Sequence, residues 1–117
     1  MKKRKLFQSF KYAMEGIVYG FRSQRNMRLH TLALVVLIFI MISVSMAIED
    51  VCLILFSAMV VMVSEMINTA IEKTIDLYTE NIHPLAKTAK DVAAGAVLLS
   101  AIFAIVVGGL IFSKYLL

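Results

Sequence analysis

Residues 51–76 read VCLILFSAMVVMVSEMINTAIEKTID, and this stretch decides how the chain folds. Its first part, residues 51–64, carries no formal charge, but it is shorter than the about 20 apolar residues that a membrane-crossing helix needs. The apolar pattern reaches that length only if the helix continues through Glu65 and Asn68. We expect this continuation, because a separate short apolar segment would be difficult to bury. The sequence therefore predicts a carboxyl group at membrane depth.

Two longer apolar runs, residues 29–48 and 92–113, flank this segment without a formal charge. Together they predict an all-α membrane protein with transmembrane helices at 29–48, 51–76 and 86–113, in one membrane domain covering 1–117. Composition agrees, because 61% of the 117 residues are hydrophobic and only 17% are charged. Such a chain has too little polar surface for a small soluble domain, and its one cysteine excludes a disulfide scaffold.

The basic residues predict the orientation of these helices. Eight of the 12 Lys and Arg residues lie in residues 1–28, three lie in residues 73–91, and one is Lys114. The expected turn at Glu49 and Asp50 contains none. With three spans, the two basic segments face the same side, which the positive-inside rule assigns to the cytoplasm. We expect a cytoplasmic N-terminus and a C-terminus outside.

A further helix is expected before the first span. Phe7, Phe10, Met14, Ile17 and Phe21 recur at steps of three and four residues, which is the period of one helix face. Charged residues fall elsewhere around this helix. The pattern predicts an amphipathic helix at 6–24 that lies on the cytoplasmic surface of the membrane. The pattern leaves open whether this helix is only an anchor or has a further role.

The second span carries a polar face. At 100° per residue, Glu65, Asn68, Glu72 and Asp76 fall within an arc of about 80°. An acidic side chain inside a membrane costs about 2.5–3.5 kcal/mol on insertion scales, so we expect Glu65 to serve a function. The alternative is a packing role, in which Glu65 and Asn68 form hydrogen bonds between helices. Carboxylates on one face suit Mg²⁺ binding, proton abstraction, or an ion or proton pathway.

A second polar cluster opens the third span, where residues 87–91 read KTAKD. Lys90 and Asp91 are expected near the cytoplasmic interface, where Glu72 and Asp76 emerge. The lysines could pair with these carboxylates or hold a polyphosphate. The chain has no GxxxxGK[ST] motif, which excludes a P-loop, and we expect His30 to be an interface residue at the start of the first span. These patterns predict an acidic, metal-binding site at the cytoplasmic interface.

The segments EMINTAIEKTID (65–76) and HPLAKTAKDVAAGAV (83–97) resemble the signature of the small prokaryotic membrane lipid kinases, the diacylglycerol kinases and undecaprenol kinases. The resemblance extends from Lys5 to the end of the third span. HPLAK and the Arg25-Asn26 pair are closer to the Gram-positive undecaprenol kinases. The resemblance implies a homotrimer in the bacterial cell membrane, with active sites shared between neighbouring subunits.

The same resemblance implies ATP- and Mg²⁺-dependent phosphorylation of a membrane lipid alcohol and no nucleic-acid partner. Undecaprenol is the expected substrate, and diacylglycerol is the alternative. Glu65 corresponds to the base that takes the proton from the lipid hydroxyl, Asn68 lies on the same catalytic face, and Glu72 corresponds to a metal-binding carboxylate. The positions that correspond to nucleotide contacts are Lys5, Tyr12, Glu72, Asp76, Asn81, Ile82, His83, Lys90 and Asp91.

Gln24 departs from the family pattern. The family carries a second metal-binding Glu immediately before Arg-Asn, and here Gln24 precedes Arg25 and Asn26. Glutamine keeps an oxygen ligand but loses the charge, so Mg²⁺ affinity should fall. Three readings stay open: a natural variant in which Glu15 helps, a protein altered to weaken turnover, or reduced activity.

Two hypotheses of other classes remain beside the kinase. One is a small ion- or proton-coupled transporter that uses Glu65, and the other is a structural membrane oligomer. The carboxylates run only from mid-membrane to the cytoplasmic side, and no charged residue continues the path outward. This distribution argues against a transport pathway.

Overall fold

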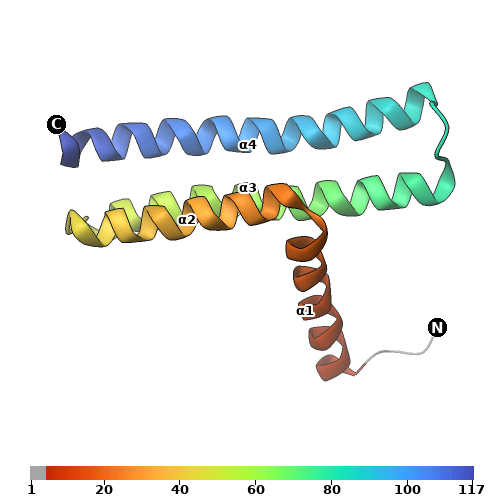
Figure 1. Ribbon diagram of the computed structural model, residues 1–117, viewed down its shortest axis with the longest axis horizontal. Coiled ribbons are helices and arrows are strands. Elements are labelled where there is room, and N and C mark those ends of the chain that lie inside the picture. The colour runs from red at the N-terminus through yellow and green to blue at the C-terminus, as the bar shows by residue number, and fades with distance from the viewer. Residues whose placement is uncertain (1–4) are drawn as a thin grey trace.

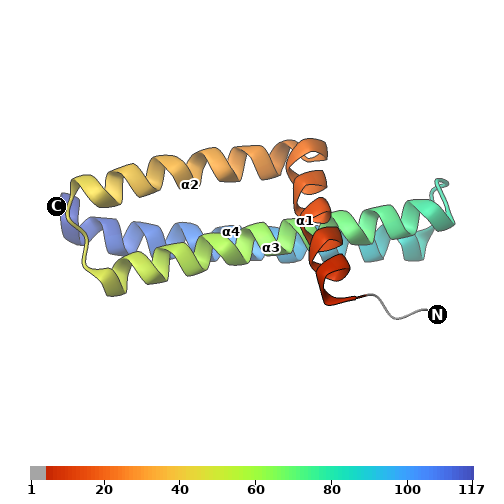
Figure 2. The same cartoon turned by 90° about the horizontal axis from the view of Figure 1, so that it is seen from below.

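The computed structural model describes residues 5–117, and this part of the chain forms four helices with no strand. The helices are α1 (Leu6–Ser23), α2 (Arg25–Ser43), α3 (Ile48–Tyr78) and α4 (Pro84–Leu116). The last three lie side by side along the long axis of the molecule, while α1 projects away from them at a steep angle (Figures 1 and 2). Three of the basic residues of the N-terminal segment, Lys2, Lys3 and Arg4, lie outside the described residues.

Three helices are long and apolar enough to cross a membrane, namely α2 with 19 residues, α3 with 31 and α4 with 33. The all-α class expected from the sequence is confirmed. The largest apolar side chains mostly point outward, and Phe39 and Leu110, for example, are each 68% exposed. A soluble domain rarely leaves such extended apolar surface in water, whereas a bilayer requires it. These features are those of a membrane protein.

The connection between α2 and α3 comes earlier than the sequence pattern indicates. It occupies residues 44–47, and Ser45 adopts a left-handed φ of 52° there. Glu49 and Asp50, expected in the turn, instead form the first turn of α3, where their charges favour the positive end of the helix dipole. Hydropathy cannot locate this turn because residues 44–48 are nearly as apolar as the helix before them.

A polar cluster fastens the end of α4 to the start of α3. The Tyr115 hydroxyl donates to Asp50 Oδ2 at 2.6 Å and accepts from the Ala47 backbone N–H at 3.0 Å. Lys114 Nζ donates to Asp50 Oδ1 at 3.1 Å. The C-terminus therefore lies at the same end of the molecule as the α2–α3 turn (Figures 1 and 2). A small apolar core packs beside this cluster, formed by Met41, Ile54 and Ile111.

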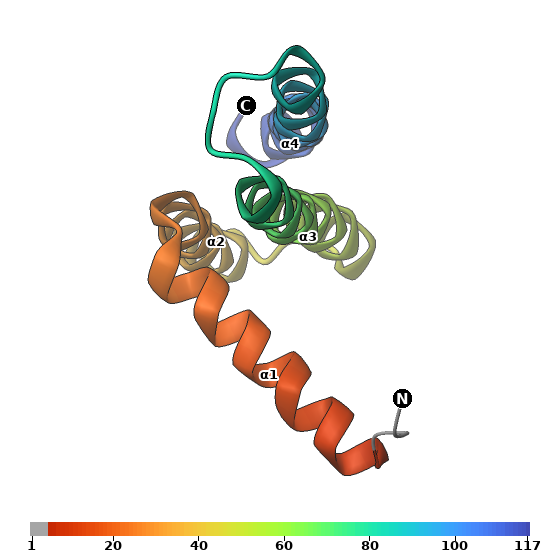
Figure 3. The ribbon, with the colours of Figure 1, turned by 90° about the vertical axis from the view of Figure 1, so that its right-hand side faces the viewer.

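Helix α3 lies between α2 and α4 (Figure 3). Its backbone approaches both closely, whereas the backbones of α2 and α4 do not come close to each other in the described residues. A cavity of about 540 Å³ lies between these two helices and against α3. Small residues from all three helices line it, among them Ala33, Ala58, Ala101, Ala104 and Gly108. The three helices thus form an open arrangement with α3 as the shared element.

We expect Tyr115→Phe to destabilise the fold by about 1–3 kcal/mol, because it removes one hydrogen bond to a carboxylate and one from a backbone N–H. Thermal unfolding in detergent, followed by circular dichroism, measures this loss. Tyr78→Phe is the matched control, because Tyr78 is 89% exposed. Equal melting temperatures for the Tyr115 variant and the parent would contradict a stabilising role for the cluster.

Candidate functional site

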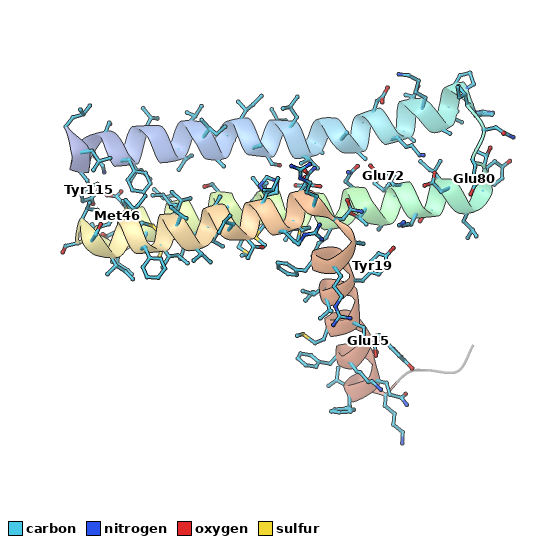
Figure 4. The ribbon with its side chains drawn as sticks, in the orientation of Figure 1. Glu15, Tyr19, Met46, Glu72, Glu80 and Tyr115 are labelled. Carbon is cyan, nitrogen blue, oxygen red and sulfur yellow. The ribbon has the colours of Figure 1, made fainter. Side chains whose placement is uncertain are left out.

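The candidate site lies on the second half of α3, from Glu65 to Asp76, which follows the apolar first half of the helix. The end of α1 packs against this region: Gly20 is buried, and the place where its Cβ would stand is 3.8 Å from Met66 Cγ. About two helical turns further along α3, the Lys73 ammonium lies 6.0 Å from the centroid of the Tyr19 ring. Figure 4 shows Tyr19 at the junction of α1 with this part of α3, near Glu72.

Glu65 is the most enclosed acidic group of the site. The residue is 3% exposed, although its helix runs through an apolar membrane segment. Its Oε1 lies 3.5 Å from Nε2 of His30, which α2 supplies. The Thr69 hydroxyl donates to the Glu65 backbone carbonyl at 2.9 Å, so Thr69 does not compete for the carboxylate. The carboxylate therefore faces a histidine rather than water.

Asn68 and Glu72 form a linked pair one turn further along the same face. Asn68 Nδ2 donates to Glu72 Oε1 at 3.2 Å, and both residues are half-buried. Asn68 Oδ1 is buried and has no hydrogen-bond partner within residues 5–117. Buried polar atoms are nearly always satisfied, so an acceptor without a partner indicates a place for a hydroxyl or a metal-bound water.

The expected lysine–carboxylate pairing is present. Lys90 Nζ donates to Asp76 Oδ1 at 2.6 Å and thereby links α4 to α3. Lys87 Nζ pairs with Asp91 Oδ2 at 2.6 Å, one turn apart on α4. Such exposed pairs contribute about 0–1 kcal/mol each to stability. Either lysine can therefore exchange its carboxylate for a phosphate at little cost.

The loop between α3 and α4 lies beyond Glu72 and contains Glu80 (Figure 4). His83 caps α4, because its Nδ1 accepts from the Leu85 backbone N–H at 3.2 Å, and Pro84 begins the helix. The Asn81 backbone N–H donates to the Thr79 hydroxyl at 3.1 Å, and Ile82 is 98% exposed. These residues border the open end of the site rather than its enclosed part.

The candidate residues of α1 are not gathered beside the others in a single chain. Helix α1 runs away from α3, and Glu15 lies on its projecting part (Figure 4). Tyr12 precedes Glu15 on the same helix and Lys5 caps its start, so both lie further from the junction at Gly20. Gln24 stands at the junction itself, half-buried between α1 and α2. Of the proposed metal ligands, Gln24 and Glu72 therefore lie near where α1 meets the other helices, and Glu15 does not.

The oxygen donors suit a magnesium ion that arrives with a nucleotide. Residues 5–117 contain no group of three or more His, Cys, Asp or Glu side chains that could hold a metal ion. Mg²⁺ needs only one or two carboxylates when phosphates and water complete its shell. Glu72, with the unpartnered Asn68 Oδ1 beside it, fits that requirement.

The sequence pattern missed the pairing of His30 with Glu65. His30 was expected only as an interface residue, yet its ring meets the predicted base. The two residues belong to different helices, and no spacing along the chain reports a contact of that kind. A second contact of the same sort joins α3 to α4, where the Ser64 and Ser100 hydroxyls lie 3.1 Å apart.

Comparison with known proteins finds relatives that match most of this chain. The model of the family described as prokaryotic diacylglycerol kinase matches residues 11–112. A diacylglycerol kinase of Synechocystis sp. is 44% identical over 105 residues, which cover 89% of this chain and 60% of that protein. An undecaprenol kinase of Bacillus subtilis is 41% identical over 109 residues, which cover 92% of this chain and 88% of that protein.

A diacylglycerol kinase of Haemophilus influenzae is 28% identical over 108 residues. The chain thus spans about three fifths of the Synechocystis protein and most of the length of the Bacillus and Haemophilus proteins. These comparisons give no support to the transporter hypothesis. On the match of residues 11–112, the chain belongs to the prokaryotic diacylglycerol kinase family, a family of lipid kinases.

Proposed function

We propose that this protein transfers the γ-phosphoryl group of ATP to the hydroxyl of a membrane lipid, with Mg²⁺ as cofactor. The observation that carries the proposal is an enclosed carboxylate, Glu65, on the same face of a membrane helix as Asn68 and Glu72. Undecaprenol, converted to undecaprenyl phosphate, is the proposed substrate, and diacylglycerol is the alternative. The undecaprenol kinase of Bacillus subtilis, matched over 88% of its length, supports this order.

Glu65 acts as the general base in this proposal. A lipid alcohol presents its hydroxyl just below the headgroups. Glu65 is expected at that depth, because it lies on the membrane side of the polar residues that end α3. Glu65 removes the hydroxyl proton while the oxygen attacks the γ-phosphorus and the bond to ADP breaks. Asn68 Oδ1, which lacks a partner, accepts a hydrogen bond on the same face.

The nucleotide is held at the open end of the site. Bound Mg²⁺ would neutralise the charge that develops on the transferring phosphoryl group. Glu72 is its proposed carboxylate ligand, with Gln24 as a weaker neutral one. Lys90 and its partner Asp76 lie where the phosphates would enter, and Lys90 can leave Asp76 for phosphate. Further nucleotide contacts are proposed at Asn81, Ile82, His83 and Asp91.

A homotrimer with shared active sites accounts for the position of α1. Lys5 and Tyr12 are proposed nucleotide contacts, yet α1 carries them away from the α3 face of its own chain (Figure 3). A second subunit beside the first can bring them to a site on its neighbour. Phe7 and Phe10 are 78% and 66% exposed on α1, which supports contact between this helix and the cytoplasmic membrane surface. The N-terminus is then cytoplasmic and the C-terminus outside, with α2, α3 and α4 as the three spans.

Labelled phosphate should pass from ATP to undecaprenol, and more slowly to diacylglycerol, in detergent micelles containing the full chain. Glu65→Gln should lower kcat about 100-fold or more, because it removes the general base but leaves the nucleotide site intact. ATP binding, measured by calorimetry, should persist in this variant. Glu49→Gln is the matched control, since Glu49 lies at the opposite end of α3. Absence of transfer to both lipids by folded protein would refute the kinase.

Glu72→Gln should weaken Mg²⁺·ATP binding about tenfold or more, because one of the few charged oxygen ligands is lost. Gln24→Glu should act in the opposite direction by restoring a second carboxylate. Titration of activity with Mg²⁺ at fixed ATP measures both shifts against the parent and Glu49→Gln. An unchanged Mg²⁺ requirement in the Glu72 variant would rule out the metal assignment.

A further inference from the structure

His30 is the group that faces the carboxylate of Glu65 from another helix. Its Nε2 lies 3.5 Å from Glu65 Oε1, and this is the ion-pair contact of Glu65 within residues 5–117. The two side chains differ greatly in exposure: that of Glu65 is 4% exposed and that of His30 is 33% exposed. The pair thus joins an enclosed carboxylate to a ring that reaches the surface of the chain.

An enclosed general base must lose its proton after every turnover. Direct transfer to water is poor for Glu65, because little of its carboxylate is exposed. The neighbouring polar groups on α3 give no route outward: Asn68 binds Glu72 through its amide, and the Thr69 hydroxyl donates to a backbone carbonyl. Lys90 is paired with Asp76 nearer the open end. His30 is therefore the available acceptor.

The acidic partner of His30 is Glu65, because the other groups around the ring are apolar or already occupied. His30 lines the cavity between α2 and α4, where the other lining residues are apolar, Leu34 and Leu37 among them. Arg28, on the same helix, donates to the backbone carbonyls of Phe21 and Arg22 at 3.1 and 2.8 Å. Its guanidinium is thus occupied at the end of α1.

We propose that His30 is a positioning residue that accepts the proton from Glu65 and passes it to water. This inference rests on the proposed function, in which Glu65 is the base. In the chemical step, the lipid O–H proton moves to the Glu65 carboxylate, the oxygen–phosphorus bond forms, and ADP leaves. The carboxylic acid then gives its proton to the Nε2 lone pair of neutral His30. The imidazolium pairs with the restored carboxylate until the Nδ1 proton passes to water. The remaining ring proton then moves from Nε2 to Nδ1 by exchange with water, which restores the Nε2 lone pair for the next turnover.

The experiment compares His30→Ala and His30→Gln with the parent in the two-lipid kinase assay on the full chain. Glutamine keeps an N–H near the position of Nε2 but cannot carry a proton through the side chain. Both variants should lose kcat about tenfold or more, with KM for lipid and for ATP within about twofold of the parent. Their melting temperatures in detergent show that the fold is retained.

Added imidazole should restore activity to His30→Ala, because the adjoining cavity of about 540 Å³ has room for the free ring. It should not restore His30→Gln, whose side chain fills the position, nor Glu65→Gln, which lacks the base. Leu34→Ala is the matched control, since it enlarges the same cavity and keeps His30. Imidazole should leave its rate unchanged.

Three results would overturn the proton-acceptor role: parental kcat in His30→Ala, parental kcat in His30→Gln, or no response of His30→Ala to imidazole. Parental activity in His30→Gln alone would show that a hydrogen bond to Glu65 suffices. A parent that phosphorylates neither lipid would instead refute the proposed function, and the inference with it. An active parent with unaffected His30 variants refutes the inference alone.

Discussion

The enclosure of Glu65 within α3 is the constraint on which the rest of the site depends. An acidic side chain in a membrane helix is costly, and the helices around it are arranged to limit that cost. Helix α2 places His30 against the carboxylate, and α3 continues outward through Asn68 and Glu72. Because the face becomes progressively more exposed toward Asp76, one helix carries both a shielded carboxylate and an open, charged end.

Helix α3 holds these side chains at different exposures because contacts with other helices fix both of its ends and its middle. At one end Asp50 is held by Tyr115 and Lys114, and toward the other Asp76 is held by Lys90. Between them, the close approach of Gly20 to Met66 anchors α1. All of these contacts involve α3, and the backbones of α2 and α4 do not come close to each other in the described residues. The space left between them is the cavity that His30 borders.

Much of this organisation follows from properties that are local in the chain. Apolar runs and the 100° helical step predicted three long helices and one face carrying Glu65, Asn68, Glu72 and Asp76. The Asn68–Glu72 hydrogen bond follows from that step, because residues four apart on a helix are neighbours. The turn at residues 44–47 did not follow, since its residues are too apolar to mark a boundary.

The sequence by itself determined the helical class, the membrane character and the presence of a carboxylate within an apolar helix, because hydropathy and periodicity are properties of neighbouring residues. Only the tertiary structure decided which groups meet across helices. His30 contacts Glu65, and Tyr115 donates a hydrogen bond to Asp50. Lys90 forms its salt bridge with Asp76 and not with Glu72. Such contacts depend on how the helices are rotated and shifted against one another, and that arrangement is set by packing between segments far apart in the chain.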